Sequence, residues 1–184
     1  MTPLEIIAAA IGIVYLLLEY RASVWMWLFG LGMDVCYCYL YWQSQCYANA
    51  GIYVYYAAMC VWGGLLWLRN LRHDEGQVRS MPAKAWLPVG VASVGLTLLV
   101  AWLLQFTNES QYLWFDALTA ALSIVGMVLM AKKYYQQWVF WLITNPLYVV
   151  FNLIIGMPAL ALMFAVYTVV SVLGIIRWKK MSQQ

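Results

Sequence analysis

Charged residues are scarce in this sequence: Asp, Glu, Lys and Arg together make up 9% of its 184 residues. A soluble domain has about 25% charged and about 45–50% apolar residues, whereas hydrophobic residues here reach 66%. No soluble fold of this size buries so much apolar surface, so we expect the chain to lie in a lipid bilayer. The chain has only 10 Lys and Arg, which also argues against a nucleic-acid-binding protein.

Residues for enzymatic chemistry are almost absent. The one histidine, His73, belongs to a charged segment between apolar runs and is expected to be a solvated loop residue. A catalytic metal or a haem in the membrane would need a set of ligands that the sequence lacks. The Gly63–Gly64 pair does not make a phosphate-binding loop. We therefore expect no enzyme activity, no metal and no cofactor.

Seven apolar stretches are candidates to cross the membrane as helices, each crossing taking about 20 residues. Their apolar runs are continuous and lack the alternation of a membrane β-barrel, so an all-α integral membrane protein is expected. The expected spans cover residues 4–18, 24–42, 51–68, 86–104, 113–131, 138–155 and 159–177.

Every basic residue falls on one side of the membrane in this arrangement. The ten residues lie at or after the ends of the first, third, fifth and seventh spans: Arg21, Arg69, Arg72, Arg79, Lys84, Lys132, Lys133, Arg177, Lys179 and Lys180. Cytoplasmic loops are enriched in Lys and Arg. The N-terminus is therefore expected outside and the C-terminus in the cytoplasm.

An internal repeat emerges when the chain is shifted by 111 residues. At this offset Arg21 coincides with Lys132, Trp27 with Trp138, Asp34 with Asn145, Tyr37 with Tyr148, Tyr56 with Tyr167, Gly63 with Gly174 and Trp67 with Trp178. The single transmembrane domain 1–184 then divides into a first repeat 1–70, a linker and connecting helix 71–105, and a second repeat 106–184. One connecting span places both copies in the same direction, a parallel 3+1+3 layout typical of transporters. A purely structural duplication is the alternative.

The sixth span carries a stripe of aromatic and amide side chains. Trp138, Trp141 and Asn145 are three and four residues apart and share one helix face. Indole rings with one amide suit a flat heteroaromatic ligand, and a positive charge on that ligand adds cation–π attraction of about 0.5–2 kcal/mol per ring. Tyr148 and Asn152 continue the stripe. All five are candidate substrate-binding residues, and helix packing is the alternative role.

The first repeat offers four further candidates. Asp34 lies midway along the second span, where a lone carboxylate costs about 2.5–3.5 kcal/mol and needs a compensating role. It either contacts a cationic substrate or is hydrogen-bonded within the helix packing. Tyr37, Tyr53 and Tyr56 are pocket candidates in two spans whose other aromatic residues are expected to face lipid or the interface.

The sequence resembles the PnuC family of bacterial vitamin transporters over essentially its whole length. The resemblance rests on the 3+1+3 layout, on the Trp-x-x-Trp-x-x-x-Asn run at Trp138, Trp141 and Asn145, on segments 114–116 and 122–133, and on Gly63 and Gly174. It implies facilitated diffusion of nicotinamide riboside, thiamine or riboflavin across the inner membrane. It also implies trapping by a cytoplasmic vitamin kinase and assembly as a homotrimer.

The resemblance also bears on the substrate. Nicotinamide riboside members of the family carry Gln and Asn in the third span where this chain has Tyr53 and Cys60. The change removes two hydrogen-bonding groups suited to a ribose and adds an aromatic face, so we expect thiamine, as in the PnuT branch. Nicotinamide riboside is the alternative, and riboflavin is less favoured. A SWEET-like sugar carrier shares the layout, but no Pro-Gln motif occurs here; a structural or sensory membrane protein is the remaining class.

Overall fold

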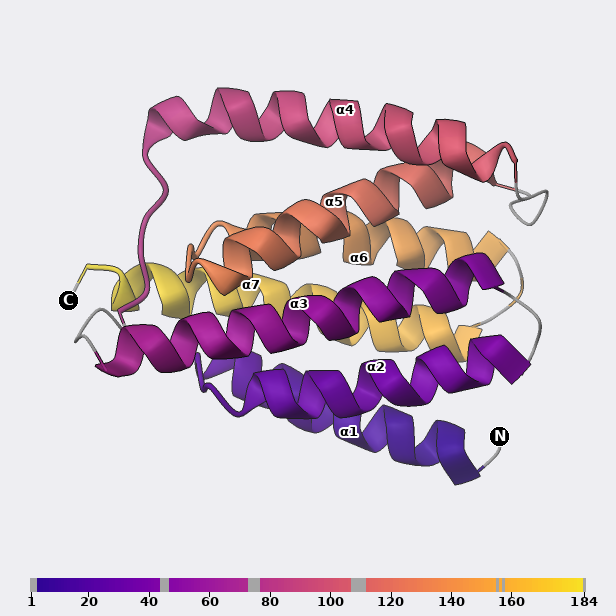
Figure 1. Cartoon of the computed structure of the whole chain (residues 1–184), viewed down its shortest axis with the longest axis horizontal. Helices are drawn as coiled ribbons and strands as arrows, with labels where there is room; N and C mark the ends of the chain where they lie inside the picture. Colours follow the sequence, from indigo (N-terminus) through magenta and orange to yellow (C-terminus); the bar gives the residue numbers. More distant parts are fainter. Residues whose placement is uncertain are drawn as a thin grey trace. The chain divides into compact units, whose positions relative to one another are not determined.

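The computed structural model describes residues 3–43, 47–72, 77–106, 112–154, 156 and 158–183. Over these residues the chain is helical apart from turns, short connecting segments and one isolated bridge (Figure 1). His73 lies outside the described residues. The chain divides into two compact units, Met1–Gln77 and Val78–Gln184.

Three helices form the first unit: α1 (Pro3–Tyr20), α2 (Met26–Gln43) and α3 (Tyr47–Arg72). α1 packs against α2, and α2 against α3. The chain reverses after α1 at Ala22, whose φ of 53° is left-handed. The N–H of Ser23 donates to the carbonyl of Leu18 at 2.9 Å. This bond, with the left-handed residue before it, ends the helix as a Schellman motif.

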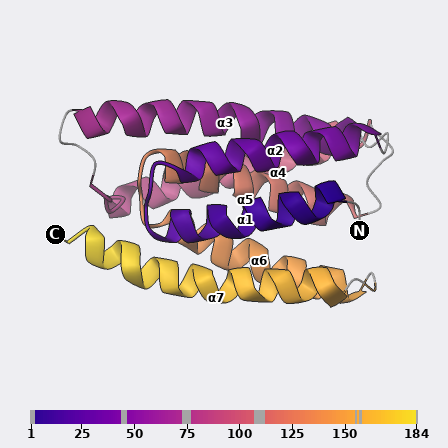
Figure 2. The ribbon, with the colours of Figure 1, turned by 90° about the horizontal axis from the view of Figure 1, so that it is seen from below.

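The second unit begins with a short 3-10 helix, η1 (Ala83–Ala85), followed by α4 (Trp86–Leu104) and α5 (Leu113–Ala131). The last two helices are α6 (Gln137–Ile154) and α7 (Pro158–Met181). Consecutive helices pack against one another, and Figure 2 shows α6 and α7 side by side.

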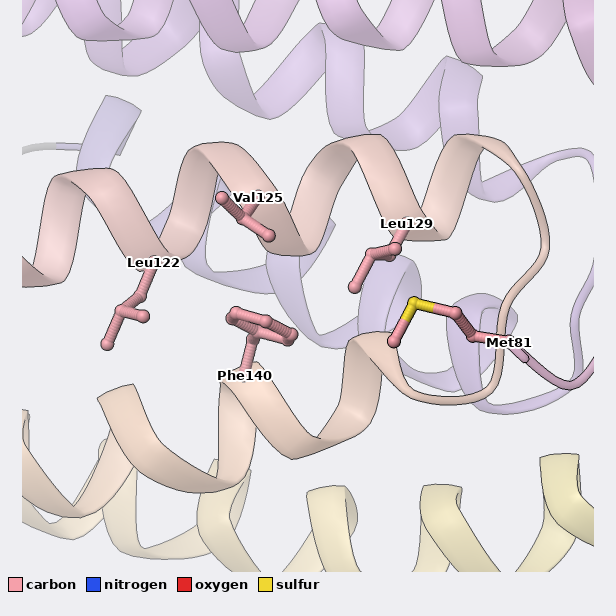
Figure 3. Packing of buried hydrophobic residues seen from close by; sticks show 5 residues of the cluster. All are labelled: Met81, Leu122, Val125, Leu129 and Phe140. Atoms are coloured by element: carbon pink, nitrogen blue, oxygen red, sulfur yellow. The ribbon is translucent and has the colours of Figure 1, made fainter. Parts of the chain in front are cut away.

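A small apolar core fixes α5 against α6 in the second unit. Phe140 of α6 points toward α5, where Leu122, Val125 and Leu129 lie, and Met81 closes one end of the cluster (Figure 3). All five side chains are buried. Met81 comes from the segment that precedes α4, so this core also ties that segment to α5 and α6.

The structure has seven α-helices in its described residues, as expected, but they differ as membrane spans. Five stretches are long and apolar enough to cross a membrane: Ala50–Arg69, Ala83–Leu104, Leu113–Ala131, Gln137–Ile154 and Ala161–Met181. The apolar stretches described in α1 and α2 are shorter, Ala10–Tyr20 and Met26–Leu40. Both helices are present with 18 residues each, and their crossing of the membrane stays a prediction.

The segment before α4 is tied to the turn between α5 and α6. The N–H of Arg79 donates to the carbonyl of Lys133 at 2.8 Å, and its carbonyl accepts from the N–H of Tyr135 at 3.1 Å. The buried side chain of Gln136 accepts from the N–H of Met81 at 3.0 Å and donates back to the Met81 carbonyl at 3.4 Å. These bonds fix where α4 begins relative to the end of α5.

We expect Gln136→Leu to lower the free energy of unfolding by about 1–3 kcal/mol, because the buried N–H of Met81 then loses its acceptor. The measurement is the thermal midpoint of the detergent-purified protein. Gln183→Leu, at an exposed position, is the matched control and should leave the midpoint unchanged. Equal midpoints for the two variants would show that the hydrogen bonds between Gln136 and Met81 contribute nothing to stability.

Candidate substrate-binding site

A hydrogen-bonded pair joins α2 to α3 within the first unit. The thiol of Cys60 donates to Oδ2 of Asp34 at 3.3 Å, and each residue is 3% exposed. Gly30, one turn before Asp34, permits the close approach of α3, since a Cβ there would lie 3.0 Å from the Cys60 sulfur. Within the described part of this unit the thiol is the only polar partner of the carboxylate, so no cationic side chain pairs with it.

Three tyrosine rings share these helix faces. The rings of Tyr37 and Tyr53 are stacked at 5.3 Å between centroids, and Tyr56 meets Tyr53 edge-on at 5.8 Å. Tyr37 follows Asp34 by three residues and Tyr56 precedes Cys60 by four, which places the rings one turn from the hydrogen-bonded pair. The structure thus brings together the four candidates that lie in the first unit.

The second unit has a matching arrangement between α6 and α7. Nδ2 of Asn145 donates to Oγ of Ser171 at 3.1 Å, and both residues are buried. The ring of Tyr148 stacks on Phe164 at 4.7 Å, and Tyr167 meets Phe164 edge-on at 6.0 Å. An amide and a hydroxyl therefore stand where the first unit has a carboxylate and a thiol.

Each of these contacts has its counterpart 111 residues away. The matched contacts are Asp34–Cys60 with Asn145–Ser171, Tyr37–Tyr53 with Tyr148–Phe164, and Tyr53–Tyr56 with Phe164–Tyr167. The turns agree as well, because Ala22 and Lys133 are the two non-glycine residues with positive φ among those described, at 53° and 57°. The sequence offset therefore coincides with a set of contacts that occurs twice.

The side chain of Trp138 packs between helices α6 and α7. It is 1% exposed, its ring lies against Gly174, and it meets Trp178 edge-on at 5.9 Å. Trp27 packs on Gly63 in the same way in the first unit. Stacking of Trp138 on a ligand would require it to leave this contact.

The remaining candidates on α6 differ in what they contact. The half-buried Trp141 donates through its indole N–H to Oε1 of Gln137. Nδ2 of Asn152 donates to the carbonyl of Tyr148 at 2.7 Å, a bond within the helix. Asn145 and Tyr148 are thus grouped with partners on α7, whereas Asn152 is engaged within α6 itself.

Sequence reasoning missed Ser171 and Phe164. A signal for both was present, because the 111-residue offset maps Cys60 onto Ser171 and Tyr53 onto Phe164. Neither pair is identical, and such substitutions pass unnoticed in a chain rich in aromatic and small residues.

The chemistry available in these groups is that of binding. They offer a carboxylate, a thiol, an amide, hydroxyls and aromatic rings. Within the described ranges, no three His, Cys, Asp or Glu side chains come together to hold a metal ion. A carboxylate with flanking rings suits a flat cation.

Comparison with known proteins gives consistent matches. The family described as nicotinamide mononucleotide transporter matches residues 2–180. The nicotinamide riboside transporter PnuC of Escherichia coli (strain K12) is 27% identical over 162 residues, which cover 74% of this chain and 68% of that protein. The PnuC of Haemophilus influenzae is 28% identical over 137 residues, covering 72% of this chain and 59% of that protein.

A solved structure resembles the whole chain. The crystal structure of the vitamin B3 transporter PnuC superposes with a TM-score of 0.79 at 26% sequence identity, covering 98% of this chain and 82% of the other. The fold and nearly the full sequence therefore agree with one family of membrane transporters, which are not enzymes. This chain belongs to the nicotinamide mononucleotide transporter family, the family of the PnuC proteins.

Proposed function

We propose that this chain carries a flat, cationic vitamin across the bacterial inner membrane by facilitated diffusion, with nicotinamide riboside as the first candidate. The observation that carries the proposal is the buried carboxylate of Asp34, whose polar partner is a thiol and not a cation. The pyridinium ring of nicotinamide riboside is planar and positively charged. Its charge is attracted by the carboxylate, and its ring can stack on Tyr37, Tyr53 or Tyr56.

The choice of substrate departs from the sequence-based expectation. The residues Tyr53 and Cys60 favour thiamine in the sequence-based comparison with the family. The named relatives in Escherichia coli and Haemophilus influenzae, however, are nicotinamide riboside transporters. These names support nicotinamide riboside over thiamine. Thiamine stays the second candidate, because its thiazolium ring is also a flat cation and Tyr53 offers that ring an aromatic face.

Each unit offers binding groups of its own. In the first unit, Asp34 would attract the positive charge of a vitamin. In the second unit, Asn145 with Ser171 would offer hydrogen bonds to a polar group. Tyr37, Tyr53, Tyr56, Tyr148 and Trp141 would supply stacking surfaces. Trp138 would contribute by packing α6 against α7. Asn152 would contribute through its hydrogen bond within α6.

We also propose that the duplicated contacts reflect two parallel repeats, 1–70 and 106–184, joined by α4, with the N-terminus outside. The repeated contacts at a 111-residue offset and the one-sided basic residues support this topology. A reporter enzyme fused after Gln184 should show its activity on the cytoplasmic side of the membrane only. Periplasmic activity would overturn the orientation.

Accumulation of the vitamin by facilitated diffusion needs a sink inside the cell. A separate cytoplasmic kinase would trap the transported vitamin as its phosphate ester. The negative phosphate would prevent the vitamin from returning through a site that binds cations. Assembly as a homotrimer is the expected oligomeric state, and the mass of the detergent-purified complex tests it.

Binding to the purified protein tests the substrate directly. Nicotinamide riboside, thiamine and riboflavin are titrated separately while intrinsic tryptophan fluorescence is followed, with Trp141→Phe as a control for the reporting ring. We expect saturable binding of nicotinamide riboside at least about tenfold tighter than thiamine, a difference of about 1.4 kcal/mol. Tighter thiamine binding would reverse the substrate order, and binding of none of the three would refute the proposal.

A further inference from the structure

A groove runs between α4 and α5 in the second unit, and its lining includes none of the residues of the α6–α7 contacts described above. In Figure 1 the two ribbons are close where α4 ends and separate toward the end where α4 begins. Apolar side chains of both helices line the groove, among them Val89 and Leu96 from α4 and Val128 from α5. Such a lining matches a hydrocarbon chain.

One end of the groove is polar. Lys132, which follows the last residue of α5, and Tyr134 both line it. Lys132 is exposed, and Lys84 is an exposed cation in η1, next to the groove residue Ala85. The ammonium group of Lys132 and the hydroxyl of Tyr134 are the donors that a phosphate requires.

Lys133 does not share this role. It is 5% exposed, and burial, followed by the nearby charge of Arg79, lowers its pKa below the ordinary lysine value. Its neighbour Lys132 therefore supplies the charge at the groove.

The polar end is held in place by the chain itself. Gln136 fixes Met81, which lines the groove, through the bonds to its N–H and carbonyl. The N–H of Tyr134 donates to the carbonyl of Leu129 at 2.9 Å, so the turn that carries Lys132 and Tyr134 is closed onto α5. The groove is thus preformed, and its polar end is held in a fixed position.

We propose that this groove is a binding site for one anionic diacyl phospholipid, with an acyl chain between α4 and α5 and the phosphate against Lys132 and Tyr134. Charge complementarity selects this occupant. A zwitterionic phospholipid would satisfy the apolar lining equally well, but its headgroup carries no net charge to pair with the lysines. An anionic lipid gains from each basic side chain near the membrane surface. All Lys and Arg of the chain lie at or after the ends of the odd-numbered spans expected from the sequence.

The test is native mass spectrometry of the full-length protein after incubation with matched phosphatidylglycerol and phosphatidylcholine. We expect retained phosphatidylglycerol to exceed phosphatidylcholine about fivefold, the factor that one surface charge contributes. Lys132→Gln should bring this ratio close to one. Lys179→Gln, an equally exposed lysine in the last turn of α7, should keep the ratio of the unmodified protein.

A second variant tests the acyl-chain position. Ala92, which lines the groove and is exposed, is replaced by Phe to fill it, and retention of both lipids should fall while the elution profile stays that of folded protein. Equal retention of the two lipids by the unmodified protein would overturn the proposal. An equal loss in Lys132→Gln and Lys179→Gln, or displacement of the lipid by glycerol phosphate alone, would overturn it as well.

Discussion

Gly174→Ala is expected to destabilise the protein more than any other single methyl group added to the second unit. A Cβ at this position would lie 2.5 Å from Cε2 of Trp138, well inside van der Waals contact. The indole cannot move aside easily because it is 1% exposed and also meets Trp178 edge-on. Overpacking of this kind costs about 1–3 kcal/mol, occasionally more.

The matching contact in the first unit supplies a second test. At Gly63, a Cβ would lie 2.6 Å from Cζ2 of Trp27, so Gly63→Ala should lower the thermal midpoint by a similar amount. Gly95→Ala, in α4 with nothing within 4 Å, is the control and should be neutral or stabilising. In Gly174→Ala, the added change Trp138→Phe should recover part of the loss. A neutral Gly174→Ala would refute the packing role of Trp138.

Asp34→Asn should have the largest effect on substrate binding. The amide keeps the size and hydrogen-bonding ability of the side chain but removes the negative charge that would face the vitamin. Loss of one partner from a buried charge pair costs about 3–5 kcal/mol, so binding of nicotinamide riboside should fall by at least about a hundredfold, which is 2.7 kcal/mol.

Comparison of two forms of the ligand separates charge from structure. Reduced nicotinamide riboside has almost the same shape but a neutral ring, so the unmodified protein should bind it much more weakly than the cation. In Asp34→Asn this preference should disappear. Asp116→Asn, in the first turn of α5, is the control and should retain the preference. An Asp34→Asn protein that still prefers the cation would show that another group recognises the charge.

The helices could be predicted from the sequence because their signals are local, and the 111-residue offset anticipated pairs of matching contacts. Long apolar runs predict each helix, and α3 extends beyond the expected 51–68 at both ends, to Tyr47 and Arg72. The pairing of Asp34 with Asn145 and of Gly63 with Gly174 predicted matching environments. Both pairs occupy equivalent contacts in the two units.

Side-chain roles within the membrane were harder to predict. The spacing of Trp138, Trp141 and Asn145 places them on one face, but it does not reveal that Gly174 receives Trp138 from a helix 36 positions further on. Hydrophobic patterning is weak evidence inside a bilayer, because lipid-facing and core-facing positions are both apolar. The hydrogen bond between Gln136 and Met81 also could not be predicted from hydrophobic periodicity, because it joins two segments outside the apolar runs.

Uptake into vesicles that contain no kinase tests the central claim most directly. The purified protein is reconstituted, and labelled nicotinamide riboside is added outside, with protein-free vesicles as the baseline and unlabelled thiamine as competitor. Facilitated diffusion predicts rapid entry that stops when the inside concentration equals the outside, with or without a proton gradient. Enclosing a vitamin kinase and ATP should then drive continued accumulation. Accumulation above the outside concentration without a kinase, or entry no faster than in protein-free vesicles, would contradict the account.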